Sequence, residues 1–362
     1  MKKIIHIVGA RPNFMKAAPV YFAIREAGKF EQLLVHTGQH YDEKMSDVFF
    51  RQLGIPKPDI NLEIGSASHA VMTAKIMIAF EQVVLDEKPD LLIVYGDVNS
   101  TIACAMVAAK LGVKVAHVEA GLRSFDRAMP EELNRMLTDS ISDYFFTTSP
   151  DADELLKKSG MPDDSIFFVG NGMIDTLVRL LPQAQKPSTE DLDIDEARGF
   201  ALVTLHRPSN VDDAEALTEI VNTLNELSKE MQVVFPIHPR TAARMKELGL
   251  NADGLTMCGP QGYLEFLWLQ KNAKMVLTDS GGIQEETTYL GVPCLTLREN
   301  TERPITVTEG TNILIGRDFD LLRSEIAKVV AGDFKKGNIP EKWEGKAGER
   351  TALILDQILN NS

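Results

Sequence analysis

Cysteine is scarce in this sequence. The chain of 362 residues has only Cys104, Cys258 and Cys294, which lie far apart. Their spacing matches no metal-binding pattern and predicts no set of disulfide bonds. We therefore interpret the cysteines as small core residues and expect no bound metal.

An excess of positive charge is absent as well. The chain has 38 lysine and arginine residues against 52 aspartate and glutamate residues, for a formal net charge of −14. Residues 1–180 hold 19 basic and 24 acidic side chains, which leaves 19 and 28 for the remainder. Because both halves are acidic, nucleic acid and anionic membrane surfaces are unfavourable partners. Basic residues inside a motif are therefore noteworthy.

Long hydrophobic runs and common cofactor motifs are also missing. The N-terminal run Ile4–Val8 is too short for the core of a signal peptide, and no stretch approaches the length of a membrane span. We expect a cytoplasmic protein. No Gly-x-Gly-x-x-Gly follows that first run, and no Walker A sequence is present, which argues against a dinucleotide cofactor.

The sequence does contain a regular alternation of short apolar runs and helical segments, which predicts parallel, doubly wound sheets. A polar segment from Pro182 to Glu196 interrupts the pattern and is the best linker candidate. We expect an α/β fold of two Rossmann-like domains facing a cleft: residues 1–180, residues 181–345, and a C-terminal helix within 346–362 that packs on either domain. The expected strands are Ile4–Val8, Leu33–Thr37, Leu91–Tyr95, Lys114–Val118, Tyr144–Thr148, Ile166–Val169, Phe200–Leu205, Val233–Ile237, Met275–Leu277 and Cys294–Leu297.

The stretch Thr278–Glu286 has the form of a strand end, a Ser-Gly-Gly turn and a helix start. Ser280 is placed to cap the helix, and Gly281 and Gly282 let backbone N–H groups approach a ligand closely. A helix N-terminus with free N–H groups is an anion site. Glu286, a turn later, suits hydroxyl groups such as those of a ribose. An ordinary strand–helix turn with a capping serine would give the same pattern.

Charged side chains follow the expected strands of the first half. Arg11 and Lys16 follow the first strand and suit a diphosphate, although a solvated helix end has the same composition. Asp97 and Glu119 follow strands that should be neighbours, so they should lie side by side where ligands bind such sheets. Glu131 begins a later helix. Carboxylates that share a site can divide acid and base roles, yet each alone is commonly a helix cap.

Two histidines of the second half, His206 and His238, also follow expected strands. A lone histidine there is commonly structural, but two of them beside the Ser-Gly-Gly turn favour a ligand site. Arg298 and Arg303 lie further along the chain, and arginine suits bidentate contact with phosphate.

Taken together, these motifs resemble the non-hydrolysing UDP-N-acetylglucosamine 2-epimerases, in order and over almost the whole chain. The resemblance implies a glycosyltransferase B-type fold, no metal or nicotinamide cofactor, a UDP-sugar substrate and usually a homodimer. The motifs are Gly9-Ala10-Arg11-Pro12 with Lys16, Gly96-Asp97, His117–Arg123, Pro130-Glu131-Glu132 with Asn134-Arg135, Thr278–Glu286 and Thr301-Glu302-Arg303-Pro304.

The resemblance also implies a reaction, the reversible inversion of UDP-N-acetylglucosamine at C2 to give UDP-N-acetylmannosamine. UDP is eliminated across C1–C2 to leave a 2-acetamidoglycal, and is added back with protonation on the other face. The catalytic candidates by motif position are Asp97, Glu119, Glu131 and His206, with the base among the carboxylates left open. The substrate-binding candidates are Arg11, Lys16, Arg135, His238, Ser280, Gly281, Gly282, Glu286 and Arg303, with Glu286 on the ribose.

One segment departs from the family pattern. Many bacterial members have Gln-His-Arg-Glu-Met-Leu where this chain has Gln39–Met45, and there the segment helps to bind a second, activating substrate molecule. The change leaves such activation open and also fits a different substrate. The nearest alternative is a UDP-2,3-diacetamido-uronic acid, which adds a carboxylate at C6 and an acetamido group at C3. A glycosyltransferase of the same fold is a further alternative, for which a single catalytic carboxylate or histidine would be enough.

Overall fold

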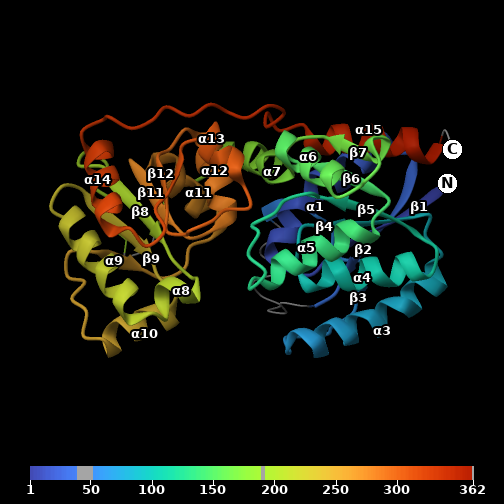
Figure 1. The fold of residues 1–362 in the computed structure, drawn as a ribbon, viewed down its shortest axis with the longest axis horizontal. Helices are drawn as coiled ribbons and strands as arrows, with labels where there is room; N and C mark the ends of the chain where they lie inside the picture. The colour runs from blue at the N-terminus through green and yellow to red at the C-terminus, as the bar shows by residue number, and fades with distance from the viewer. Residues whose placement is uncertain (39–51, 189–191, 361–362) are drawn as a thin grey trace. The chain divides into compact units, whose positions relative to one another are not determined.

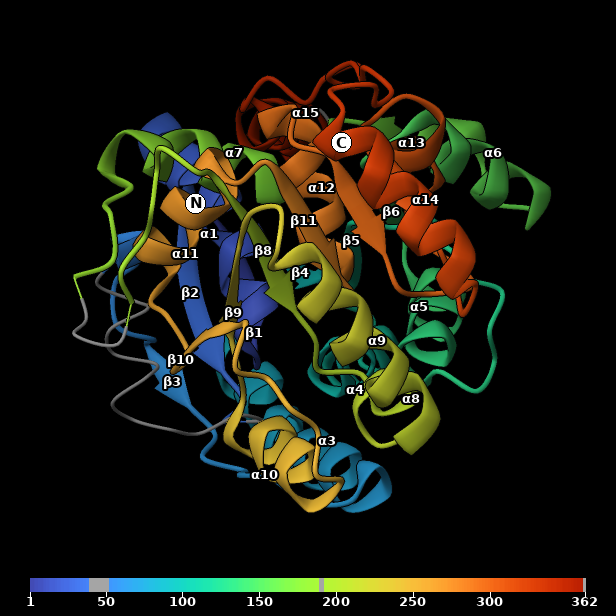
Figure 2. The same ribbon diagram turned by 90° about the vertical axis from the view of Figure 1, so that its left-hand side faces the viewer.

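The computed structural model describes residues 1–38, 52–188 and 192–360, and the chain forms two compact units. The first unit combines Met1–Arg179 with Glu341–Ser362, and the second comprises Leu180–Pro340. Figures 1 and 2 show the chain from two directions. The altered segment Gln39–Met45 lies outside the described residues.

A seven-stranded sheet of parallel pairs forms the centre of the first unit, in the order β3-β2-β1-β4-β5-β6-β7. Its strands are β1 Lys2–Val8, β2 Phe30–His36, β3 Ile60–Asn61, β4 Leu91–Tyr95, β5 Lys114–Val118, β6 Tyr144–Thr147 and β7 Ile166–Phe168. The helices are α1 Arg11–Ala27, α3 His69–Glu87, α4 Asn99–Lys110, α5 Pro130–Ile141, α6 Pro150–Lys158, η1 Asp163–Ser165, α7 Gly172–Leu180 and α15 Ala347–Asn360.

Helices cover both faces of this sheet, which explains why its central strands are apolar throughout. Every residue of β4 is buried, as expected for a parallel strand between two helix layers. On one face, Ile76 and Phe80 of α3 pack with Ile5 and Leu92 of the sheet in one core cluster. Figure 1 shows α3 and α4 on that side of the sheet, and α15 on the other, where it packs against α1.

The second unit has a six-stranded sheet, again of parallel pairs, in the order β10-β9-β8-β11-β12-β13. Its strands are β8 Phe200–Thr204, β9 Gln232–Pro236, β10 Thr256–Cys258, β11 Met275–Thr278, β12 Cys294–Thr296 and β13 Asn312–Leu314. The helices are η2 Leu181–Gln183, α8 Pro208–Val211, α9 Ala214–Leu227, α10 Pro239–Glu247, α11 Tyr263–Asn272, α12 Gly281–Leu290, α13 Pro304–Thr308 and α14 Phe319–Val330.

The alternation of side chains along β8 divides the core of the second unit into two layers. Val203 packs in a cluster with residues of α9 and α14, including Leu217 and Leu322. Leu202 points to the opposite cluster, which contains Leu269 of α11. The predicted α/β class with parallel sheets is therefore confirmed. The polar motifs lie in the loops that follow the C-terminal ends of the strands.

Candidate functional site

Two of the predicted carboxylates follow neighbouring strands. β4 and β5 are paired, with Tyr95 opposite Val118, and the N–H of Gly96 donates to the carbonyl of Val118 at 3.0 Å. Asp97 and Glu119 therefore follow adjacent strand ends, as predicted. The N-cap of α4 is Val98 rather than Asp97, so a capping role does not explain this aspartate.

Each of these carboxylates is paired with a cation. Lys16 Nζ lies 2.7 Å from Glu119 Oε1, and both side chains are almost fully buried. Arg135 of α5 forms an ion pair with Asp97, and its second partner is Glu132, at 2.9 Å. The structure thus brings four of the predicted site residues together as two ion pairs at one edge of the sheet.

The backbone is adapted to this arrangement at two positions. Gly96 has φ +60°, and a Cβ there would lie 2.6 Å from Lys16 Nζ, so any other residue would displace the lysine ammonium from its present position. Glu119 has φ +71°, in the left-handed region that residues with a side chain rarely adopt. Such strain costs about 1–3 kcal/mol and is commonly found at functional sites.

The two consecutive glutamates of α5 have different environments. Pro130 is the first residue of the helix, Glu131 is exposed in its first turn, and Glu132 is buried. Burial raises the pKa of Glu132, but hydrogen bonds from the Ser124 backbone and the Arg135 side chain outweigh it, so the net pKa is lowered. Glu132 is therefore a fixed anion of α5 that holds the loop at Ser124, whereas Glu131 is accessible to a ligand.

The loop that leads into α1 carries Arg11, the first residue of that helix. The side chain of Asn13 fixes this loop: its Oδ1 accepts the N–H groups of Gly9 and Ala10, each at 3.2 Å. Its Nδ2 donates to the carbonyl of Tyr95 at 2.8 Å, which ties the loop to the end of β4. The loop with Arg11, at the end of β1, is thus held beside the end of β4, which Asp97 follows.

In the second unit, His206 follows β8 and is oriented by Asp279, which follows β11. His206 Nδ1 lies 2.8 Å from Asp279 Oδ1, with the histidine side chain 59% exposed and the aspartate side chain fully buried. Asp279 Oδ2 also accepts the Arg207 N–H at 2.9 Å and the Asn210 side chain at 3.0 Å. This arrangement leaves the far edge of the imidazole towards solvent, where it can meet a ligand.

The environment of Asp279 keeps it ionised. Burial raises the pKa of Asp279, but hydrogen bonds from His206, Arg207 and Asn210 outweigh it and lower the pKa overall. A buried anion that holds one ring nitrogen of a histidine is the usual partner of an acid–base histidine. The sequence motif contains Asp279, but its role was not predicted, because the pairing with residue 206 appears only in the fold.

Helix α12 begins at the predicted Ser-Gly-Gly turn, with Ser280 at the N-cap and Gly281 and Gly282 in the first turn. The prediction that the Ser280 side chain caps this helix was wrong, since it makes no capping hydrogen bond. Instead, Thr278 Oγ1 accepts the Ser280 N–H at 3.0 Å, which holds the turn through its backbone. The first N–H groups of α12 therefore have no side-chain cap, which suits an incoming anion.

Arg303 lies against this turn. Its guanidinium is paired with Glu302 and, through Nε at 2.9 Å, with Glu285 of α12. Glu302 is also paired with Arg298, at 2.7 Å, in a buried network. A Cβ on Gly281 would lie 2.6 Å from Arg303 Nη1, so the absence of a side chain there allows the arginine to approach the helix N-terminus.

The remaining two predicted binding residues have partners within the second unit. Glu286 is buried, and its carboxylate accepts hydrogen bonds from the Tyr263 hydroxyl at 2.8 Å and from Gln270 at 2.6 Å. His238 is the N-cap of α10, where its Nδ1 accepts the Arg240 N–H at 3.2 Å.

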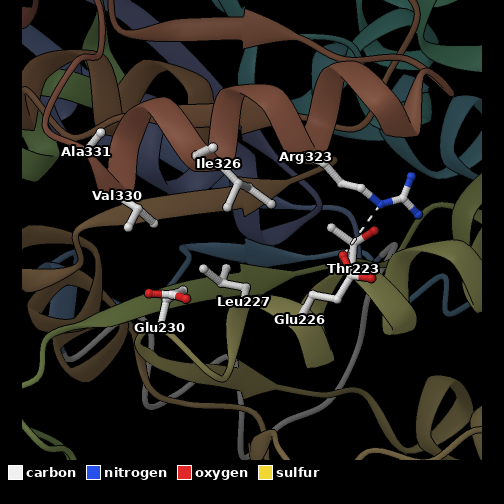
Figure 3. Close-up of a pocket in the computed structure, with 9 residues that line it drawn as sticks. Thr223, Glu226, Leu227, Glu230, Arg323, Ile326, Val330 and Ala331 are labelled. Atoms are coloured by element: carbon white, nitrogen blue, oxygen red, sulfur yellow. Dashed lines mark ion pairs between the residues drawn. The ribbon is translucent and has the colours of Figure 1, made fainter.

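A separate pocket of about 330 Å³ lies between α9 and α14 (Figure 3). Arg323 lines it and is paired with Glu226 at 3.6 Å. Because a helix after a parallel strand runs back along the sheet, the end of α9 lies at the opposite sheet edge from His206. The pocket is therefore not part of the candidate site. Its lining residues are Thr223, Glu226, Leu227, Glu230, Arg323, Ile326, Ala327, Val330 and Ala331.

The described part of the chain lacks two kinds of feature, a metal-binding cluster and a membrane-spanning helix. Among the residues that the structure describes, no group of three or more histidine, cysteine, aspartate or glutamate side chains is arranged to hold a metal ion. No helix among residues 1–38, 52–188 and 192–360 has both the length and the apolar character needed to cross a bilayer.

Comparison with known proteins identifies the family of the chain. Residues 22–356 match the model of the family described as UDP-N-acetylglucosamine 2-epimerase. The UDP-N-acetylglucosamine 2-epimerase of Methanocaldococcus jannaschii is 44% identical, over 98% of each chain. The UDP-2,3-diacetamido-2,3-dideoxy-D-glucuronate 2-epimerase of Pseudomonas aeruginosa is also 44% identical, over 91% of this chain and 94% of the relative.

Solved structures extend the comparison to the fold. The M. jannaschii enzyme in complex with UDP-GlcNAc and UDP superposes with a TM-score of 0.85 at 43% identity, over 98% of this chain and 99% of that one. The lipopolysaccharide outer core galactosyltransferase WaaB, at 15% identity and a TM-score of 0.56 over the whole of both chains, shows the likeness of fold alone. The fold is thus of the glycosyltransferase B type, and the chain belongs to the UDP-N-acetylglucosamine 2-epimerase family.

Proposed function

We propose that this protein is an isomerase that interconverts UDP-N-acetylglucosamine and UDP-N-acetylmannosamine. The observation that carries the proposal is the pair of carboxylates, Asp97 and Glu119, at adjacent strand ends, each with a cation at its side. An inversion at C2 must remove a proton on one face and deliver one on the other, which needs more than one acid–base group. A glycosyltransferase of the same fold would need fewer acid–base groups.

In the proposed first step, a carboxylate removes the C2 proton while the C1–O bond breaks. UDP leaves with the electron pair of that bond, and a 2-acetamidoglycal remains. In the second step, UDP attacks C1 again and C2 receives a proton on the opposite face, so that atoms and charge balance. Asp97, Glu119 and Glu131 are the candidates for these proton transfers. Their assignment as base and acid is open.

Negative charge grows on the diphosphate as the C1–O bond breaks, so groups that stabilise this charge lower the barrier. In our proposal the second unit binds the nucleotide: the N-terminus of α12 at Ser280–Gly282 and Arg303 meet the diphosphate, with His238 nearby, and Glu286 meets the ribose. The imidazole of His206, held by Asp279, is the candidate acid at the leaving oxygen. Arg11, Lys16 and Arg135 contribute positive charge from the first unit.

A single incubation tests the reaction. The protein is mixed with UDP-N-acetylglucosamine alone in deuterated water, and the products are followed by proton NMR. We expect UDP-N-acetylmannosamine to appear and deuterium to enter C2 of both epimers, with no acceptor present. Stable UDP-N-acetylglucosamine without exchange at C2 would contradict the proposal.

The substrate alternative is favoured by one specific observation, the 44% identity to the Pseudomonas enzyme named for UDP-2,3-diacetamido-2,3-dideoxy-D-glucuronate. The same incubation, repeated with that nucleotide sugar, distinguishes it from UDP-N-acetylglucosamine as the substrate. We expect a higher kcat/KM for UDP-N-acetylglucosamine. The reverse ranking would move the assignment to the uronic acid while leaving the C2 chemistry unchanged.

We also propose that the protein is a homodimer. An apolar stripe on α3 supports this: Val71, Ile78 and Leu85 are 46%, 74% and 51% exposed, and their spacing of seven residues puts them on one side of the helix. A row of exposed apolar side chains along one helix face is typical of an interaction surface.

A further inference from the structure

Two histidines are fully buried in the first sheet and have no part in the function described so far. His6 lies on β1 and His117 on β5, and both have 0% exposure. In each, both ring nitrogens are within hydrogen-bond distance of a partner. The chemistry of those partners differs, and it determines how many protons each ring carries.

Both partners of His117 can only accept. Nε2 lies 2.8 Å from the carbonyl oxygen of Gly96, which has no proton to give. Nδ1 lies 2.7 Å from Oδ1 of Asp139. If Asp139 is ionised, both ring nitrogens must carry a proton, and His117 is an imidazolium ion.

The surroundings of Asp139 keep it ionised. Its Oδ2 accepts the N–H of Gly121 at 3.2 Å and pairs with Arg123 Nη1 at 2.6 Å. Burial raises the pKa of Asp139, but hydrogen bonds and charge from His117 and Arg123 outweigh it, so the pKa is lowered overall. Because Oδ2 receives the Gly121 N–H and the Arg123 guanidinium, the ionised carboxylate is favoured, and Oδ1 is left to accept from His117.

His6 provides the contrast. Its Nδ1 lies 2.7 Å from the Tyr95 hydroxyl and its Nε2 lies 2.9 Å from the side-chain amide of Gln32. A hydroxyl and an amide can each donate or accept, so a neutral ring satisfies both contacts. Burial lowers the pKa of His6 to about 4, in agreement with a neutral ring.

The partners of His117 belong to the segments that carry the candidate carboxylates. The Gly96 carbonyl is part of the peptide bond to Asp97, and Gly121 lies two residues after Glu119. Asp139 is on the same helix as the residue that pairs with Asp97. His117 and Asp139 together therefore connect three segments of the site.

We propose that His117 is a buried imidazolium that, with Asp139, positions the peptide of Asp97 and the loop of Glu119 for proton transfer at C2. It is a positioning residue, because it acts through these groups and does not itself meet the substrate. The kinetic part of this inference rests on the proposed epimerase function, whereas the charge state of the ring does not.

The charge state is measured on the wild-type protein labelled with ¹⁵N-histidine. Long-range ¹H–¹⁵N spectra distinguish a ring with two protonated nitrogens from a neutral tautomer. We expect His117 to show two protonated nitrogens at neutral pH and His6 to show one, with assignments from His117→Gln and His6→Gln. A neutral His117 would overturn the proposal, whether or not the protein is an epimerase.

The positioning role is measured by kinetics. His117→Gln should lower kcat by ~10-fold or more with KM changed by less than about 2-fold, because small misplacement of reacting groups is costly. His6→Gln, an equally buried change in the same sheet, should keep kcat. Asp139→Asn removes the anion beside the ring, so it should leave His117 with a single ring proton and should also lower kcat. This variant provides the test if His117→Gln fails to fold. Unchanged kcat in a folded variant of either residue would overturn the role.

Discussion

At the scale of single residues, Arg303 has partners before any nucleotide binds, so folding and binding must be separated when it is changed. Removing one partner of a buried ion pair typically costs about 3–5 kcal/mol, because the remaining charge is unpaired. Arg303→Ala should therefore lower the free energy of unfolding by that order, since Glu285 loses this cation and Glu302 retains only Arg298. It should also weaken UDP binding by about 2–5 kcal/mol if the guanidinium meets the diphosphate.

A matched control for this prediction is Arg298→Ala, which removes the other cation beside Glu302. We expect this variant to lose a similar free energy of unfolding, measured by urea denaturation, and to keep nearly the same UDP affinity, measured by calorimetry. If folded Arg303→Ala binds UDP as tightly as the wild type, Arg303 does not belong to the nucleotide site.

The sequence predicted the residues that follow strand ends, but it could not predict the partners that those residues have in the fold. Asp97 and Glu119 could be placed side by side because each follows an apolar run, and consecutive runs commonly pair in parallel sheets. The partners Asp279 and Asp139 could not be assigned, since each acts on a histidine 73 or 22 residues away through a tertiary contact. Charged residues paired inside the fold have the same local sequence signal as solvated ones.

At the scale of elements, α15 is attached to the first unit through the side chain of Asp175 on α7. Asp175 accepts the N–H groups of Ala347 and Gly348, at 3.0 Å and 2.8 Å, at the first turn of α15. Burial raises the pKa of Asp175 from 3.8 to about 6, although these two hydrogen bonds oppose the rise. The folded protein thus holds this proton more tightly than the unfolded chain does.

This pKa difference predicts a pH dependence of stability. The contribution of Asp175 is fully present below pH ~3.8 and is lost as the pH rises through about 6, where the folded protein must bury the charge. The loss is on the order of 3 kcal/mol for a rise of about two pKa units. Asp175→Asn has no charge to bury, so its free energy of unfolding relative to wild type should rise between pH 4 and pH 7. A constant difference across that range, measured by urea denaturation, would argue against a raised pKa.

Elements were predictable where their sequence was long and strongly patterned. The limits of β4 and β5 agree with the predicted strands Leu91–Tyr95 and Lys114–Val118. The short strands β3, β10 and β13 were missed, because two or three residues are too few to show a hydrophobic pattern. Their position at sheet edges depends on neighbouring strands rather than on their own sequence.

At the scale of the whole molecule, the proposed dimer depends on the apolar stripe of α3. Ile78→Glu puts a charge at the centre of that stripe and should shift the protein from dimer to monomer in light scattering. The control is Leu353→Glu on α15, where a single leucine is 65% exposed, and we expect it to leave the mass unchanged. A dimer that survives Ile78→Glu, at the lowest concentration that can be measured, would rule out this surface as the interface.

In the proposed mechanism, carboxylates of the first unit move protons on and off C2, so exchange at that carbon measures their action. Asp97→Asn, Glu119→Gln and Glu131→Gln are made separately, checked for UDP binding, and incubated with UDP-N-acetylglucosamine in deuterated water. We expect the variants to fold and bind UDP, and at least one to lose ~10²-fold or more in epimerisation and in deuterium uptake at C2. Near-native exchange and turnover in all three variants would contradict it.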